Sequence, residues 1–229
     1  MSDETNEFQV DSPDTPLPEL TVNQARVFAC LIEKHLSTPN SYPLTINSLV
    51  TASNQKTNRH PVMALTEGEV GHISNELSDL GLARIEYGNR ANKVSHLAMR
   101  ALGMSREEIA VLSILILREP LTLSEIKART DKMVAFESIE KVKETANNLL
   151  KRRYSPLILL GKAPGRREDR YSHTLSGDVD IESFSFVESA PSSSPRQAVL
   201  ADDSEAMKRI EALEAKVESL ERMLEELTS

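Results

Sequence analysis

The sequence predicts an α+β fold that is mainly α, with two tandem winged helix-turn-helix domains followed by a C-terminal coiled-coil helix. Two observations predict it. The order helix, short strand, helix, helix, hairpin occurs twice in the middle of the chain, and a heptad repeat of apolar residues runs along its end. The expected parts are a disordered acidic leader (1–20), winged-helix domain 1 (21–100), winged-helix domain 2 (101–180), a Ser/Pro-rich linker (181–203) and the C-terminal coiled-coil helix (204–229).

The first copy opens with a capping-box pattern, in which Thr21 is followed three residues later by Gln24. Apolar residues then recur at helical spacing as far as Leu36. The remaining expected elements of this copy are a short extended piece leading into a short helix (43–49), a helix from Thr66 that ends before Gly81, and strands over 82–87 and 93–98.

The second copy repeats this layout. It has a capping box at Ser105 and Glu108, an extended piece and helix over 120–126, a helix from about Glu137, and strands over 157–160 and 170–175. Matching positions lie 84 residues apart at the first helix and 77 apart at the second. The first copy therefore carries seven extra residues in one connection, as is typical of a duplicated small domain.

The last segment has the heptad pattern of a two-stranded coiled coil. Charged residues flank the apolar positions so that a parallel pair would bring Arg209 and Lys216 opposite Glu214 and Glu221. The pattern predicts a homodimer, and the alternative is an amphipathic helix that folds back onto its own domain. The residues expected at the dimer interface are Ile210, Leu213, Val217, Leu220, Leu224 and Leu227.

The formal net charge of −8 is unevenly distributed. Residues 1–20 sum to −6 and residues 178–229 to −8, whereas residues 21–177 sum to +6. The single cysteine excludes a disulfide within the chain. Neither a signal peptide nor a run of roughly 20 apolar residues is present, so we expect a cytoplasmic protein without membrane contact.

Three motifs stand out: the block from Asn54 to Met63, Gly88-Asn89-Arg90 with Lys93, and the segment from Pro164 to Arg167. They resemble motifs of the YceH-type family of uncharacterised bacterial proteins. The resemblance covers about residues 21–180. It implies two winged-helix domains and supplies no established activity, and the acidic leader lies outside it.

A winged helix reads DNA with its third helix and contacts the backbone with its hairpin. In the first copy the third helix does not meet this requirement, because it carries four acids and neither Lys nor Arg. The second copy is richer in cations at its third helix and its hairpin. The candidate nucleic-acid contacts are Lys56, Arg59, Arg90, Lys93, Arg152, Arg153, Lys162, Arg166, Arg167 and Arg170.

The block around Lys56 and Arg59 has two interpretations. Its composition suits phosphate contact, but its side chains could instead satisfy buried backbone groups in a long connection, and we favour the structural interpretation.

No catalytic or metal-binding pattern stands out. The five histidines are dispersed, and Cys30 sits among apolar neighbours. We therefore expect no enzyme activity, no metal, no cofactor, and no evident small-molecule ligand. The predicted function is duplex DNA binding in a regulatory or accessory role; the alternative is a protein-protein interaction module that uses winged helices as docking surfaces without DNA binding.

Overall fold

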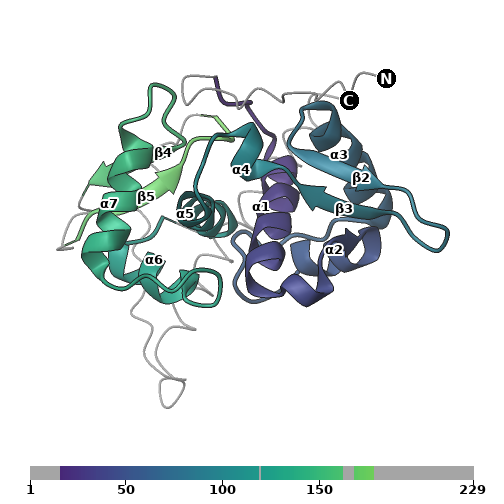
Figure 1. Cartoon of the computed structure of the whole chain (residues 1–229), viewed down its shortest axis with the longest axis horizontal. Helices are drawn as coiled ribbons and strands as arrows, with labels where there is room; N and C mark the ends of the chain where they lie inside the picture. The colour runs from purple at the N-terminus through teal and green to yellow at the C-terminus, as the bar shows by residue number, and fades with distance from the viewer. Residues whose placement is uncertain (1–15, 119, 162–167, 178–229) are drawn as a thin grey trace, which may run out of the picture. The chain divides into compact units, whose positions relative to one another are not determined.

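A computed structural model of the chain describes residues 16–118, 120–161 and 168–177 (Figure 1). Within these ranges the structure is α+β, with seven α-helices and small antiparallel sheets. In chain order the elements are α1 (Val22–Ser37), the short 3₁₀ helix η1 (Pro39–Ser41), β1 (Leu44–Thr45), α2 (Ile46–Ser53), α3 (Glu67–Asp79), β2 (Ala83–Glu86), β3 (Lys93–His96), α4 (Ala98–Ala101), α5 (Arg106–Leu117), α6 (Leu123–Thr130), α7 (Ile139–Leu150), β4 (Leu157–Gly161) and β5 (Arg170–His173).

The helix starts follow the predicted capping boxes. The boxes at Thr21, Thr66 and Ser105 are all formed, each with the side chain three residues later bonded back to the cap. A fourth box, at Thr122 with Glu125, starts α6 and was not predicted. Past the end of α3, Gly81 has a φ of +70°, which is the left-handed conformation expected of a glycine that terminates a helix.

The strands form two antiparallel sheets. In the first copy of the repeat the order is β1-β3-β2, with Leu44 opposite Val94 and Ala83 opposite His96. In the second copy β4 pairs with β5, and Leu121 adds an isolated bridge to Tyr171. The mixed α+β class is therefore confirmed, and residues 21–100 have the predicted order of elements, with η1 and α4 as additional short helices. In the predicted second copy, the extended piece before α6 is an isolated bridge and not a strand.

The core is built around the first helix of each copy. Every residue from Ile109 to Leu117 on α5 is buried, and so is every residue from Ala25 to Ile32 on α1. A helix that is apolar all round must be covered on all sides, and α1 packs against α5 (Figure 1). The division into domains at 21–100 and 101–180 stays a prediction.

The part of the chain that the structure describes begins before α1, at Pro16. Leu20 is buried, and its backbone N–H donates to the carbonyl oxygen of Leu175 at 2.7 Å. Leu20, which we expected to belong to a disordered leader, thus packs against the fold because its side chain is apolar and its N–H pairs with a backbone carbonyl. Residues 1–15, the predicted linker and the predicted coiled-coil helix lie outside the described residues.

Candidate nucleic-acid interface

The ten candidate cations fall into three groups. Arg59, Arg152 and Arg170 bond to other parts of the fold. Lys56, Arg90, Lys93 and Arg153 have exposed side chains. Lys162, Arg166 and Arg167 lie outside the described residues, as do all six predicted dimer residues.

Arg59 is a structural brace rather than a surface cation. Its side chain is fully buried and forms an ion pair with Glu33 of α1, while its Nε donates to the carbonyl oxygen of Ala52 at 3.0 Å. Burial alone would raise the pKa of the Glu33 carboxyl, but hydrogen bonds and charge from Arg59 hold that pKa below its ordinary value. We therefore remove Arg59 from the candidate contacts.

The connection between α2 and α3 is held in a second place. The Asn54 side chain donates to the carbonyl oxygen of Leu65 at 2.7 Å and accepts from the Leu65 N–H at 2.8 Å. These bonds satisfy backbone groups that a long connection would otherwise leave unpaired. They favour the structural interpretation of this segment, with only Lys56 left as an exposed cation.

Arg152 and Arg170 also have internal partners. The Arg152 guanidinium donates to the carbonyl oxygens of Leu102 at 2.8 Å and Gly103 at 2.7 Å, and pairs with Glu108 at 3.2 Å. Arg170 donates to the carbonyl oxygen of Pro120 and lies 3.6 Å from Glu125. Because these bonds hold both guanidinium groups against the fold, we remove the two residues from the candidate contacts as well.

The β2–β3 hairpin keeps its cations exposed. Ala83 and Val94 are buried on one face of the hairpin, while Arg84 and Lys93 are exposed on the other, as alternation along a strand requires. Sequence reasoning missed Arg84, which the same alternation could have identified. The loop from Tyr87 to Asn92, which carries Arg90 and two asparagines, is exposed throughout and projects beyond the helices (Figure 1).

The third helix of the first copy, α3, presents acids to solvent. Glu67, Glu69 and Asp79 are exposed, and Glu69 is committed to the capping box with Thr66. In the second copy, Lys141 of α7 pairs with Glu144 at 2.7 Å on the exposed face. Neither third helix therefore offers a uniformly positive face to a polyanion.

Two histidines that are far apart in sequence meet beside β3. His35 Nδ1 lies 2.8 Å from His96 Nε2, and His96 Nδ1 accepts from the Ala98 N–H at 3.1 Å. Because that bond leaves the proton of a neutral imidazole on Nε2, His96 donates to His35. The Tyr42 ring stacks on His35 at 4.7 Å between centroids. These groups bond to one another, and in the described part of the chain no set of three or more His, Cys, Asp or Glu residues is placed to hold a metal ion.

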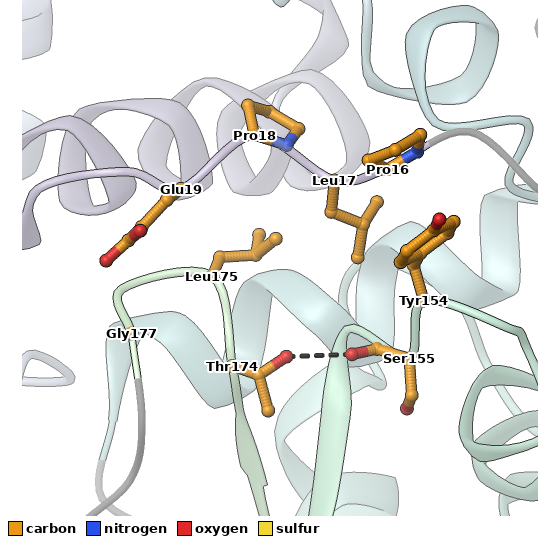
Figure 2. Close-up of a pocket in the computed structure, with 9 residues that line it drawn as sticks. All are labelled: Pro16, Leu17, Pro18, Glu19, Tyr154, Ser155, Thr174, Leu175 and Gly177. Carbon is orange, nitrogen blue, oxygen red and sulfur yellow. Dashed lines mark hydrogen bonds between the residues drawn. The ribbon is translucent and has the colours of Figure 1, made fainter.

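A cleft of about 350 Å³ lies beside the N-terminal segment. Figure 2 shows Pro16 to Glu19 running past the strand end that carries Leu175, with Tyr154 on the other side. The Thr174 hydroxyl donates to the carbonyl oxygen of Ser155 at 2.8 Å, and this bond joins two of the segments that line the cleft. The walls are largely apolar and lack a cluster of charged groups.

A family model described as "Protein of unknown function, DUF480" matches residues 20–183. The chain belongs to the DUF480 family. The match confirms the expected membership of a family of uncharacterised bacterial proteins, and it includes every helix and strand described above. Of the residues around the cleft in Figure 2, Pro16 to Glu19 precede the DUF480 match.

Similar proteins extend the likeness beyond the DUF480 match. The UPF0502 protein of Xanthomonas campestris pv. campestris (strain B100) is 39% identical over 212 residues, covering 93% of this chain and 94% of the relative. The UPF0502 protein of Stenotrophomonas maltophilia (strain K279a) is 38% identical over 220 residues, covering 95% and 97%. Along the described residues of this chain, no helix has the length and hydropathy that crossing a membrane requires.

Proposed function

We propose that each copy of the repeat is a winged helix and that this cytoplasmic protein binds duplex DNA through the β2–β3 hairpin. The order α1, β1, α2, α3, β2, β3 with the sheet order β1-β3-β2 supports the fold, because it places a hairpin directly after the third helix. The second copy supports it with the order α5, α6, α7, β4, β5 and the bridge from Leu121 to Tyr171.

The observation that carries the proposal is the exposed cationic face of the hairpin. Arg84, Arg90 and Lys93 are all exposed, and Glu86 is the only acid from Ala83 to Lys93. Asn89 and Asn92 at the tip add amide donors and acceptors. Such a surface suits phosphate oxygens and the edge of a groove.

The acidic third helix defines the mode of binding. Glu67, Glu69 and Asp79 would repel phosphates if α3 entered the major groove. The hairpin would therefore contact the backbone without reading bases through α3. Binding of this kind tolerates many sequences and weakens steeply with salt.

The test compares two triple variants of the full chain. Arg84→Gln with Arg90→Gln and Lys93→Gln removes the cations of the hairpin, and Arg106→Gln with Arg129→Gln and Lys132→Gln removes three exposed cations from α5 and α6 and the turn after it. Each triple variant loses three positive charges. Binding to a mixed-sequence duplex is followed by fluorescence anisotropy from about 50 to 200 mM salt.

We expect the hairpin variant to reduce the slope of log affinity against log salt by about 2 to 3, since each phosphate contact contributes about 0.9. The control should keep the wild-type slope. Equal losses in both variants would show that net charge, and not the hairpin, governs binding.

The second candidate function is protein docking on α3, which the exposed acids of that helix favour. A basic partner would meet Glu67, Glu69 and Asp79 without an intervening cation on the helix. The same titration separates the two functions. If the wild-type chain shows no saturable binding to DNA even at about 50 mM salt, the docking function replaces the DNA proposal.

We propose further that residues 204–229 form a parallel two-stranded coiled coil, which makes the protein a homodimer. The support is the heptad repeat of apolar residues, together with flanking residues whose charges would be opposite across a parallel pair.

A further inference from the structure

A second cavity, of about 260 Å³, lies where four segments of the fold meet. They are the first turns of α1, the connection between α2 and α3, the end of α5, and the residues at and after β5. Val22, Met63 and Ile116 supply apolar wall. Four of its other side chains have a buried polar atom that finds no hydrogen-bond partner among the described residues: Arg26, Arg118, His173 and Ser176.

Arg26 is the most buried of these four. It is 2% exposed, and its two terminal nitrogens donate to backbone carbonyl oxygens, at 3.2 Å to Ser53 and 2.7 Å to Pro61. Its Nε has no partner. Burial lowers the pKa of this guanidinium, and the nearby charge of Arg59 lowers it further. Carbonyl oxygens solvate the positive charge of Arg26 but do not neutralise it.

Arg118 brings a second positive charge to the same cavity. Burial lowers its pKa to about 10, repulsion from Arg129 and Arg59 acts in the same direction, and attraction by Glu33 opposes them. That carboxylate is already bonded to Arg59. Among the described residues, no Asp or Glu forms an ion pair with Arg26 or Arg118.

The remaining two groups are uncharged hydrogen-bonding partners. Burial lowers the pKa of His173 to about 4, so the imidazole is neutral near pH 7. Its Nδ1 and the Ser176 hydroxyl oxygen are both buried and unpartnered. Unsatisfied buried polar atoms are rare in folded proteins, and four of the side chains that line this cavity each carry one atom that has no partner among the described residues.

We propose that this cavity binds a small organic anion, whose carboxylate or phosphate group bonds to Arg26 and Arg118 and whose apolar part packs against Val22, Met63 and Ile116. The anion would supply negative charge next to two guanidinium groups that form no ion pair among the described residues. It would also offer an acceptor to these guanidinium groups and to the Ser176 hydroxyl. A cavity of about 260 Å³ is many times what one water occupies and approaches the size of small-molecule sites. The site is separate from the β2–β3 hairpin and does not depend on the DNA proposal.

The experiment uses the full chain with two anionic probes, benzoate and inorganic phosphate, and with benzamide as the neutral counterpart of benzoate. Binding is measured by calorimetry, and the Nε–H signals of arginine are followed by NMR. Arg118→Met removes one charge from the cavity wall, and Arg106→Met is the matched control, because Arg106 is exposed at the start of α5 and lies outside both the cavity and the hairpin.

We expect saturable binding of benzoate, at least about tenfold tighter than benzamide, and a loss of that preference in Arg118→Met but not in Arg106→Met. Arginine Nε–H signals should shift on binding. Ser176→Ala, which removes only a hydroxyl, should weaken binding by about two- to tenfold and serves if Arg118→Met does not fold. Glu119 follows Arg118 in the sequence and lies outside the described residues. Because Glu119→Gln removes a negative charge next to Arg118 along the chain, it should leave benzoate binding as tight or tighter.

Three results would overturn the proposal. The first is no saturable binding of benzoate or phosphate up to about 10 mM. The second is equal affinity for benzoate and benzamide, which would make the cavity an apolar site only. The third is benzoate binding that Arg118→Met and Ser176→Ala both leave unchanged, or that Glu119→Gln weakens.

Discussion

Acidification should destabilise the fold through His96. This side chain is 8% exposed, and burial together with the nearby His35 lowers its pKa to about 4 from an ordinary value of 6.5. Above pH 6.5 the imidazole is neutral in both the folded and the unfolded chain. Between pH 6.5 and 4 the unfolded chain binds a proton that the folded chain excludes, so the free energy of unfolding falls as the pH falls.

The size of the effect follows from the two pKa values. Their difference corresponds to about 3 kcal/mol once both states are protonated, since one pKa unit is worth about 1.4 kcal/mol. At pH 5 the folded form is still mostly neutral, so about 2 kcal/mol of this has been lost relative to pH 7.

The assay is urea unfolding at pH 7 and pH 5 of the wild type and of His96→Asn. The Asn side chain can still accept from the Ala98 N–H but does not titrate, so we expect its loss of stability between the two pH values to be about 2 kcal/mol smaller than that of the wild type. His72→Asn is the control, because His72 is 75% exposed. The reasoning is refuted if His96→Asn loses as much stability as the wild type does.

The remaining predictions concern Arg59 and the C-terminal helix. Arg59→Ala should lower the free energy of unfolding by about 3 to 5 kcal/mol, because it removes the buried guanidinium that bonds the Glu33 carboxylate and leaves that carboxylate only the more distant Lys34, at 3.4 Å, among the described residues. Lys56→Ala on the exposed side of the same connection should change it by less than about 0.5 kcal/mol. Thermal or urea unfolding measures both, and similar small effects would contradict the bracing role of Arg59. Leu213→Asp with Leu220→Asp should convert the expected dimer into a monomer in sedimentation experiments; an unchanged mass would exclude the coiled coil as its cause.

The sequence predicted the helices well where local chemistry determines them. Thr21, Thr66 and Ser105 each start a helix as expected, because a capping box involves residues only three positions apart. The strand pairs also follow from local alternation and the polar turn between them.

The candidate site was less predictable, because it depends on contacts between distant residues. Arg59 has the composition of a phosphate contact, and only the fold places it against Glu33, 26 residues earlier. His35 and His96 are 61 residues apart and carry no spacing motif. The anion cavity collects Arg26, Arg118 and Ser176 from three different segments, so no window of the sequence contains it.

The hydrogen bond between Leu20 and Leu175 brings the two ends of the described fold together. Figure 2 shows the same closeness between the segment up to Glu19 and Gly177. Residues 1–15 and 178–229 are therefore attached at neighbouring points, and these two segments hold most of the acidic excess of the chain. The chain therefore enters and leaves the described fold at the same edge.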